Sequence, residues 1–332
     1  MPALNAQELL RALGAGPASG DALARRFGLT RAAVWKQVQA LREAGVPVDA
    51  VPGRGYALGQ PLDLLDDGAI RRALSPAASA SLSRLEVAWS LDSTNAALLR
   101  EPVPERGARV LLAERQRAGR GRQGRHWHSP LAANLYLSVS RAFSGGLARL
   151  GGLGLVAGVA VADTLHAFGA SAVRLKWPND LVVCDAVNDA VGSRKLGGLL
   201  VEGSGQPAGS ARAVIGLGLN VRMPVEAAQD IDQPWTDLAA VLEAPPARSA
   251  LSAAVLDRLL PALEAFDREG LGPFLEAFAR YDALRGRQVL LHTADGPVPG
   301  LALGVAEDGA LRVELEGRER RVHSGEVSVR AA

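Results

Sequence analysis

The sequence predicts an α+β protein with three parts: an N-terminal winged helix-turn-helix, a central α/β domain around a mixed sheet, and a small C-terminal β-barrel. Three patterns support this prediction. Short helical segments and a hairpin occupy the start of the chain, strand-like runs mix with helices in its middle, and short strands separated by Asp-Gly and Glu-Gly turns end it. We place the three domains at residues 1–60, 64–280 and 281–332.

The composition is that of an ordinary globular protein. Of 332 residues, 48% are hydrophobic and 22% charged, with a formal net charge of +2, which argues against a disordered chain or a polycation. The single cysteine, Cys184, excludes an internal disulfide and a cysteine metal cluster. The longest charge-free apolar run, between Arg149 and Asp163, is shorter than the roughly 20 residues that span a bilayer. We therefore expect a soluble, cytoplasmic protein without a secretory signal or a membrane association.

The first part of the chain contains three expected helices. Two lie at residues 4–13 and 21–27, and Thr30 is a suitable N-cap for a third helix that ends near Gly45. The second and third helices, joined by a short turn, form a helix-turn-helix. Apolar residues at i, i+4 and i+7 give the third helix one buried face. The other face and its flanks carry Arg31, Trp35, Lys36, Gln39 and Arg42.

A hairpin follows the third helix and completes a winged helix. Residues 48–51 and 56–58 are the expected strands, and Arg54 lies at the tip, where it could reach a phosphate. Residues 1–60 carry seven basic and four acidic side chains. The alternative is a small helical domain that contacts proteins. The basic outer face and the basic wing tip together favour DNA.

The central part is expected to be a mixed α+β domain behind a linker at residues 60–63. The helix at 147–168 is apolar nearly all round and rich in Gly and Ala, so it should be buried against a sheet. The other expected helices are 65–74, 94–100 and 250–268, and the expected strands are 109–113, 135–139, 173–177, 181–184, 196–201 and 213–219.

A glycine- and arginine-rich segment, Gln116 to Trp127, is the strongest motif. Glycine lets backbone N–H groups close on an anion, and arginine neutralises phosphate with a planar set of donors. The segment is neither a P-loop nor a dinucleotide fingerprint. A disordered nucleic-acid-binding segment is less favoured, because the run is short and lies between two apolar strands. Trp127 could stack on a purine or belong to the core.

Four further motifs have both a structural and a functional interpretation. Residues 92–95, Asp-Ser-Thr-Asn, either cap a helix or bind a neutral polar ligand such as a ureido ring. Residues 176–180, Lys-Trp-Pro-Asn-Asp, form either a plain turn or a site for ligand or Mg²⁺-phosphate. Lys195 is either solvated or paired with charge developing on a phosphate. The glycines of 197–198 and of 216–220 allow close approach of a ligand. Together these motifs, without a catalytic triad or a metal-ligand cluster, indicate nucleotidyl transfer by positioning and charge neutralisation.

The end of the chain, from Tyr281, is expected to be a barrel of short strands at 288–292, 299–305, 311–315 and 321–328. It carries no evident catalytic set.

The chain resembles the bifunctional biotin protein ligases and biotin operon repressors of the BirA type. The motifs that carry the resemblance run nearly end to end: T-R-A-A-V, V-P-G-R-G-Y, D-S-T-N, Q-x-A-G-R-G-R-x-G-R-x-W, K-W-P-N-D, R-K-L-G-G and G-L-G-L-N. The resemblance implies a class II synthetase-like ligase domain and an SH3-like C-terminal barrel that packs on the ATP side of the site.

The resemblance also implies the chemistry. Biotin and ATP would bind with Mg²⁺, held mainly through phosphates, and the biotin carboxylate would attack the α-phosphate to give biotinyl-5′-AMP. A lysine of a biotin carboxyl carrier protein would then displace AMP. Arg122 and Lys195 would be catalytic, and Trp127 would cover the adenine. Biotin would be bound by Ser93, Thr94, Asn95, Gln116, Arg120, Gly121, Arg122, Lys195 and Gly198. ATP would be bound by Arg122, Arg125, Trp127, Lys176, Asn179, Asp180 and Asn220.

Regulation is implied as well. The adenylate-bound chain would form a homodimer through its central sheet and repress biotin biosynthesis genes by binding operator DNA, and the acceptor protein would compete for the dimer surface. Two features depart from the family pattern: residues 185–194 lengthen a hairpin beside Lys195, and Trp35 is an unexpected outer-face aromatic that either shifts DNA specificity or packs on the wing. The implied DNA-binding residues are Arg31, Trp35, Lys36, Gln39, Arg42 and Arg54.

Three alternatives remain open. A ligase whose winged helix no longer binds an operator is weakly disfavoured by the basic wing. A biotin-sensing transcription factor without catalysis is disfavoured because sensing biotin requires no phosphate-binding arginines and lysine. A lipoate ligase is disfavoured by residues 119–124 and by the D-S-T-N motif.

Overall fold

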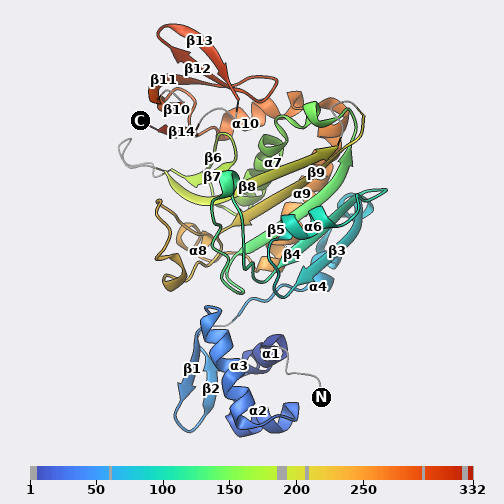
Figure 1. The fold of residues 1–332 in the computed structure, drawn as a ribbon, viewed down its shortest axis with the longest axis vertical. Helices are drawn as coiled ribbons and strands as arrows, with labels where there is room; N and C mark the ends of the chain where they lie inside the picture. The colour runs from blue at the N-terminus through green and yellow to red at the C-terminus, as the bar shows by residue number, and fades with distance from the viewer. Residues whose placement is uncertain are drawn as a thin grey trace.

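The computed structural model describes residues 6–59, 62–184, 193–205, 209–293, 296–323 and 328–331. Figure 1 shows three parts along the long axis: a helical N-terminal part at one end, a large central sheet with helices, and a small sheet at the other end. Within the described ranges, no helix combines the length and apolar character that crossing a bilayer would require.

The N-terminal part is the predicted winged helix. Thr30 begins the third helix as predicted, because its hydroxyl accepts a hydrogen bond from Ala33 N at 3.2 Å. Val34, Val38 and Leu41 form the buried face of that helix. The elements are α1 (Ala6–Gly14), α2 (Gly20–Phe27), α3 (Arg31–Glu43), β1 (Val48–Val51) and β2 (Gly55–Leu58).

The wing is fastened to the helices at one point that requires glycine. Ala18 and Tyr56 exchange two backbone hydrogen bonds of 2.9 Å, which pull β2 against the segment before α2. Gly55 beside them has φ of +93°, and a Cβ there would lie 2.4 Å from Ala18 O. Only glycine permits both the left-handed conformation and this close approach.

A seven-stranded mixed sheet forms the centre, in the order β3-β4-β5-β9-β8-β7-β6. β3 and β4 pair in parallel, and every other neighbouring pair is antiparallel. The six predicted strands are confirmed within a few residues at their ends, but β3 was not predicted. Ser83 and Arg84 are consecutive and both exposed, as is possible in an edge strand. The sequence of β3 therefore lacks the alternation of apolar and polar residues by which a strand is predicted. The strands are β3 (Leu82–Ala88), β4 (Ala108–Ala113), β5 (Leu135–Phe143), β6 (Val173–Lys176), β7 (Asp180–Val183), β8 (Arg194–Gly205) and β9 (Ala211–Leu219).

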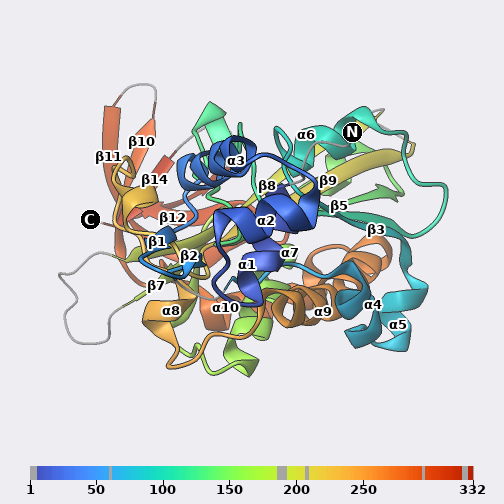
Figure 2. The same cartoon turned by 90° about the horizontal axis from the view of Figure 1, so that it is seen from below.

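Helices cover one face of this sheet, and the short α6 lies on the other (Figure 2). α7 is buried nearly all round as predicted, but the single helix expected at 147–168 is wrong. A 3₁₀ turn at Leu147–Leu150 comes first, and Gly152 with φ of +81° separates it from α7. The short helices α5, α8 and α10 were not predicted. The helices are α4 (Asp67–Ala73), α5 (Pro76–Ala80), α6 (Thr94–Arg100), α7 (Leu153–Ala167), α8 (Leu238–Val241), α9 (Arg248–Glu269) and α10 (Leu275–Tyr281).

The C-terminal part is a five-stranded antiparallel sheet in the order β13-β12-β11-β10-β14. The single strand predicted at 321–328 is wrong: β13 begins at Arg318, directly after the Glu316-Gly317 turn, and β14 begins at Ser328. Trp177 Nε1 donates a 3.0 Å hydrogen bond to Gly309 O and so joins this sheet to the central domain. The strands are β10 (Gln288–Thr293), β11 (Gly296–Val305), β12 (Leu311–Leu315), β13 (Arg318–Val322) and β14 (Ser328–Ala331).

A buried ion pair fastens the segment that leads from the winged helix into the central domain. Arg248 and Glu114 are 1% and 2% exposed, and their side chains meet at 2.6 Å. Arg248 Nε also donates to Asp63 O at 2.8 Å, and Glu114 Oε1 accepts from Leu65 N at 2.6 Å. Residues 63–65 are thereby tied to the end of β4 and the start of α9.

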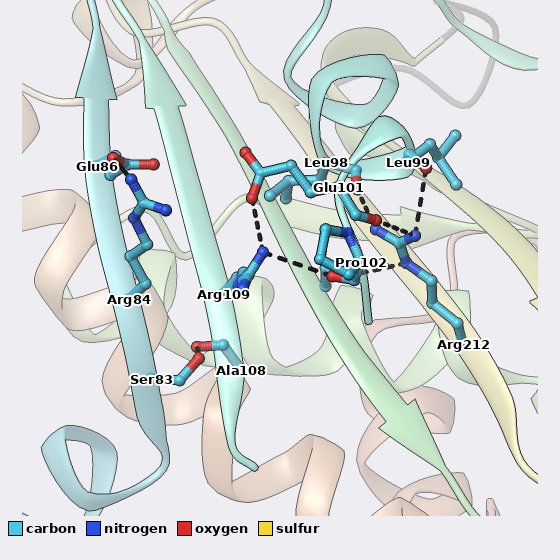
Figure 3. A network of polar contacts seen from close by, with 11 residues as sticks. Ser83, Arg84, Glu86, Leu98, Leu99, Glu101, Pro102, Ala108, Arg109 and Arg212 are labelled. Carbon is cyan, nitrogen blue, oxygen red and sulfur yellow. Dashed lines mark hydrogen bonds and ion pairs between the residues drawn. The ribbon is translucent and has the colours of Figure 1, made fainter. Parts of the chain in front are cut away.

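The C-terminal end of α6 is held by an arginine from the sheet beneath it (Figure 3). Arg212 is 7% exposed and donates to the carbonyl oxygens of Leu98, Leu99 and Glu101. A cation that binds the free carbonyls of a helix end stabilises that end. α6 is too short to be stable alone, so this contact contributes to its position.

We expect Arg212→Ala to lower the free energy of unfolding by about 2–3 kcal/mol, because buried carbonyl groups lose their donor. Urea denaturation with an unchanged m-value would measure the loss. Arg84→Ala is the matched control: Arg84 pairs with Glu86 on the same sheet, but their side chains are 53% and 42% exposed, so stability should change little (Figure 3). Equal losses in the two variants would contradict the role assigned to Arg212.

Candidate functional site

One cavity of about 890 Å³ opens on the α6 side of the central sheet. The five motifs singled out in the sequence meet there, although they lie far apart along the chain. Every residue predicted to bind biotin or ATP lines this cavity: Ser93, Thr94, Asn95, Gln116, Arg120, Gly121, Arg122, Arg125, Trp127, Lys176, Asn179, Asp180, Lys195, Gly198 and Asn220.

The glycine- and arginine-rich segment forms one wall and folds back on itself. Gly121 N donates to Arg125 O at 2.7 Å, and Trp127 N donates to Gly119 O at 2.9 Å. A Cβ on Gly119 would lie 2.5 Å from Trp127 O, so only glycine lets the two ends of the segment come this close together. The arginines are thus carried on an ordered loop, and the disordered alternative is wrong for these residues.

A chain of polar side chains, which starts from Gln116 at the beginning of that segment, forms a second wall beside α6. Gln116 Oε1 accepts hydrogen bonds from Thr94 N at 2.9 Å and from Thr94 Oγ1 at 3.1 Å. Gln116 Nε2 donates to Ser129 Oγ at 3.1 Å. Ser138 Oγ, buried on β5, lies 2.7 Å from Thr94 Oγ1 and 2.6 Å from Asn95 Oδ1. Each side chain fixes the next, so this wall is preorganised.

The residues of the D-S-T-N motif do not share one role. Ser93 caps α6, since its hydroxyl accepts from Ala96 N at 3.4 Å, which confirms the structural interpretation for that residue. Asn95 is 3% exposed, and its Nδ2 donates to Leu200 O at 3.2 Å and to Glu202 Oε2 at 2.8 Å. Because Asn95 Oδ1 lies against Ser138, both ends of this amide are engaged within the protein.

Two cations of the site lie beside a polar partner. Lys195 Nζ is 2.8 Å from Asp180 Oδ1, and Arg122 Nη1 donates to Asn179 Oδ1 at 3.2 Å. Burial lowers the pKa of Arg122, and the neighbouring Asp180 opposes that shift. A guanidinium stays protonated at neutral pH even so. The cavity therefore presents fixed positive charge, as an anionic ligand requires.

Several buried side-chain polar atoms among the described residues have no hydrogen-bond partner, and two of them belong to cavity residues: Trp127 Nε1 and Asn220 Oδ1. The Trp127 ring packs on Gly218, where a Cβ would lie 2.4 Å from it, and Lys195 Nζ is 5.7 Å from the ring centroid. A buried polar group without a hydrogen bond costs free energy of folding. An unpaired donor and an unpaired acceptor on residues of the same cavity are therefore consistent with a polar ligand.

The sequence interpretation missed part of the lining. Residues 230–235 reach the cavity because Lys195 N donates to Pro234 O at 2.9 Å, which lays this segment beside Lys195. Trp235 was detectable only as one of few aromatics. His126 and His128 also line the cavity with ring centroids 4.8 Å apart. Burial and the neighbouring His128 lower the pKa of His126, so this imidazole favours its neutral form.

The predicted DNA-binding residues lie on α3 and at the turn of the wing. Trp35 is 53% exposed. With its amide oriented to suit its neighbours, Gln39 Oε1 accepts from Trp35 Nε1 at 3.2 Å and from Arg42 Nη1 at 3.1 Å. Arg42 Nε donates to Val48 O at 2.8 Å, which ties α3 to the wing. Arg31, Lys36 and Arg54 are exposed, and Arg31 lies 3.3 Å from Asp21.

The lengthened hairpin predicted at 185–194 lies mostly outside the described residues, which resume at Ser193.

Three family models match the chain. The biotin/lipoate A/B protein ligase family matches residues 88–220, an HTH domain matches residues 5–57, and the biotin protein ligase C-terminal domain matches residues 285–330. The bifunctional ligase/repressor BirA of Salmonella typhimurium is 40% identical over 95% of this chain and 93% of its own length. The protein of the same name from Escherichia coli is 38% identical over the same shares. A solved structure of biotin protein ligase from Aquifex aeolicus in complex with biotin and ATP is 26% identical, with a TM-score of 0.60 over 75% of this chain and 100% of that one.

Proposed function

The chain belongs to the family of bifunctional ligase/repressors of the BirA type, and from this premise we propose that it joins biotin to a lysine of an acceptor protein and represses transcription through its winged helix. The observation that carries the ligase is the single cavity in which Gln116, Arg122 and Lys195 meet. Amides and hydroxyls suit an uncharged ring, while the cations suit a triphosphate.

The first step would be attack of the biotin carboxylate on the α-phosphate of ATP, with pyrophosphate leaving. Two anions must approach each other, so the barrier falls when fixed cations lie beside both of them. We assign this role to Arg122 and Lys195, the former on the glycine-rich loop and the latter at the start of β8. Gln116 and Thr94, held by their mutual hydrogen bonds, would position biotin.

The second step would be transfer to an acceptor lysine on a biotin carboxyl carrier protein. The lysine amine would attack the carbonyl carbon of the mixed anhydride, an amide bond would form, and AMP would leave. Arg125, Lys176 and Asn220 would bind the nucleotide, together with Trp127 on the adenine. These assignments rest on the cavity lining and on the unsatisfied Asn220 Oδ1.

Mg²⁺ would be held chiefly by phosphate oxygens. No group of three or more His, Cys, Asp or Glu side chains is placed to hold a metal in the part of the chain that the structure describes. Asp180 and Asn179 line the cavity and supply oxygen ligands of the kind that Mg²⁺ prefers. When bound, the ion would supply charge neutralisation on the triphosphate.

Repression would require binding of operator DNA by a homodimer of the adenylate-bound chain in the cytoplasm. The exposed Arg31, Lys36 and Arg54 would contact phosphates, while Trp35 and Gln39 on the outer face of α3 would approach base edges.

Ligation is tested by incubating the protein with ATP, Mg²⁺, biotin and an apo biotin carboxyl carrier domain. Intact-mass spectrometry should show one biotin mass added to a single lysine. No addition to a carrier that a known ligase modifies would refute the ligase proposal.

DNA binding is tested by titrating the protein onto its own upstream region and onto those of biotin biosynthesis genes. We expect binding that strengthens when biotin and ATP are supplied together and weakens steeply with salt. DNA binding that does not change when biotin and ATP are added would contradict repression controlled by the adenylate.

A further inference from the structure

Glu202 joins the two walls of the cavity through its contacts with Asn95 and Arg120. It lies on β8 and does not line the cavity itself. Its Oε2 accepts the hydrogen bond from Asn95 Nδ2 at 2.8 Å, and its Oε1 lies 3.3 Å from Arg120 Nη2. Asn95 belongs to the polar wall beside α6, and Arg120 belongs to the glycine- and arginine-rich loop. One carboxylate therefore connects the loop to the preorganised wall.

The charges of this arrangement favour a closed loop. The Glu202 side chain is 28% exposed, and Arg120 is the cation that pairs with it among the described residues. If the loop moved away, this partly buried carboxylate would keep only the amide N–H of Asn95, which neutralises no charge. Asn95 cannot move with the loop, because it is 3% exposed and its amide also donates to Leu200 O. It is packed closely against Gly216, where a Cβ would lie 2.3 Å from Asn95 Oδ1. The fixed end of the connection is thus the wall, and the movable end is Arg120.

We propose that Glu202 is a positioning residue that retains the loop over the cavity by holding Arg120, and that it slows the escape of the bound adenylate. This inference rests on the proposed ligase function. It differs from a role in binding, because Glu202 lies outside the cavity and acts only through Arg120 and Asn95. The contact of Arg122 with Asn179 is of another kind, because both of those residues line the cavity and would meet the ligand.

Glu202→Gln separates these functions. The amide keeps the size of the side chain, and its oxygen can still accept from Asn95, but it loses the charge that attracts Arg120. We expect the dissociation rate of biotinyl-5′-AMP to rise about two- to fivefold, within the range typical of a partly exposed ion pair, with Tm and the KM for ATP unchanged. Stopped-flow displacement of the preformed adenylate by excess biotin measures this rate.

Arg120→Gln tests the same contact from the loop. Arg120 is 45% exposed, so the substitution should fold, and because Arg120 also lines the cavity it should raise the dissociation rate by at least the same factor. In the double variant the effects should not add, since either change already removes the ion pair. Additive effects, or a Glu202→Gln rate equal to that of the unmodified protein, would overturn the proposal.

Glu101→Gln is the matched control. Its carboxylate also pairs with an arginine, Arg109 at 2.7 Å, near the other end of α6 (Figure 3). In the described part of the chain, Glu101 pairs with Arg109 and Arg212, which both lie outside the loop, so adenylate dissociation should not change. A protein that binds no adenylate at all would contradict the proposed ligase, whereas equal dissociation rates in a protein that binds it would contradict only the role of Glu202.

Discussion

Lys195→Ala is expected to slow adenylate formation by a factor of about 10²–10³, because it removes a preorganised cation from the place where negative charge gathers. Lys195 is held by Asp180 at 2.8 Å and packs over Trp127, so its ammonium is oriented before any ligand arrives. A flexible surface lysine would first have to be ordered and would contribute far less. Pyrophosphate release under saturating biotin and ATP measures the loss.

The two half-reactions distinguish catalysis from a general disturbance of the site. If Lys195 acts on the carboxylate and α-phosphate, transfer from supplied biotinyl-5′-AMP to the carrier should fall much less than adenylate formation. Lys195→Arg should not restore the rate, since a planar guanidinium cannot occupy the position of a compact ammonium. A variant with kcat within about threefold of the unmodified protein would remove Lys195 from the mechanism.

What could be predicted from the sequence was local, or followed from a repeating pattern. The Thr30 cap depends on a hydrogen bond between residues only three positions apart in the chain, from Ala33 N to the Thr30 hydroxyl. The burial of α7 could be predicted because its residues are apolar on every side of the helix. The central strands were visible as apolar runs. The glycines of 216–220 were interpreted as allowing close approach of a ligand, but the side chains that the structure places against them are the protein's own: Asn95 at Gly216 and the Trp127 ring at Gly218.

What could not be predicted depends on contacts between distant residues. Asn95 and Glu202 are 107 residues apart, and their contact exists because α6 packs on β5 and β9, beside β8 in the sheet. The 230–235 segment reaches the cavity through the backbone of Lys195, which no side-chain pattern reveals. β3 was not predicted because this edge strand exposes consecutive polar residues. The break before α7 was not predicted because Gly152 is one of several glycines in that part of the sequence and gives no distinct signal. The roles assigned to the cavity residues remain predictions, although all of them line one cavity.

Arg248→Met is expected to lower the free energy of unfolding by about 3–5 kcal/mol, because it leaves the buried carboxylate of Glu114 without its cation. Asp63 O and Asn134 O also lose the guanidinium, so residues 63–65 should loosen with the winged helix attached to them. Arg312→Met breaks a bidentate pair with Glu319 on the exposed face of the C-terminal sheet and is the matched control, with little change expected. Urea denaturation compares the two variants.

The pH dependence identifies the cause of that loss. Burial raises the pKa of Glu114 above 4.5, its ordinary value, and Arg248 opposes the shift, so removing Arg248 should raise the pKa further. A carboxyl group with a raised pKa in the folded state contributes stability that is present at low pH and is lost as the pH rises through that pKa. The loss in Arg248→Met should therefore be smaller at pH 5 than at pH 8. Glu114→Leu should show no such relief, since Arg248 stays charged throughout. Equal losses at both pH values in Arg248→Met would mean that the ion pair does not set the stability of this junction.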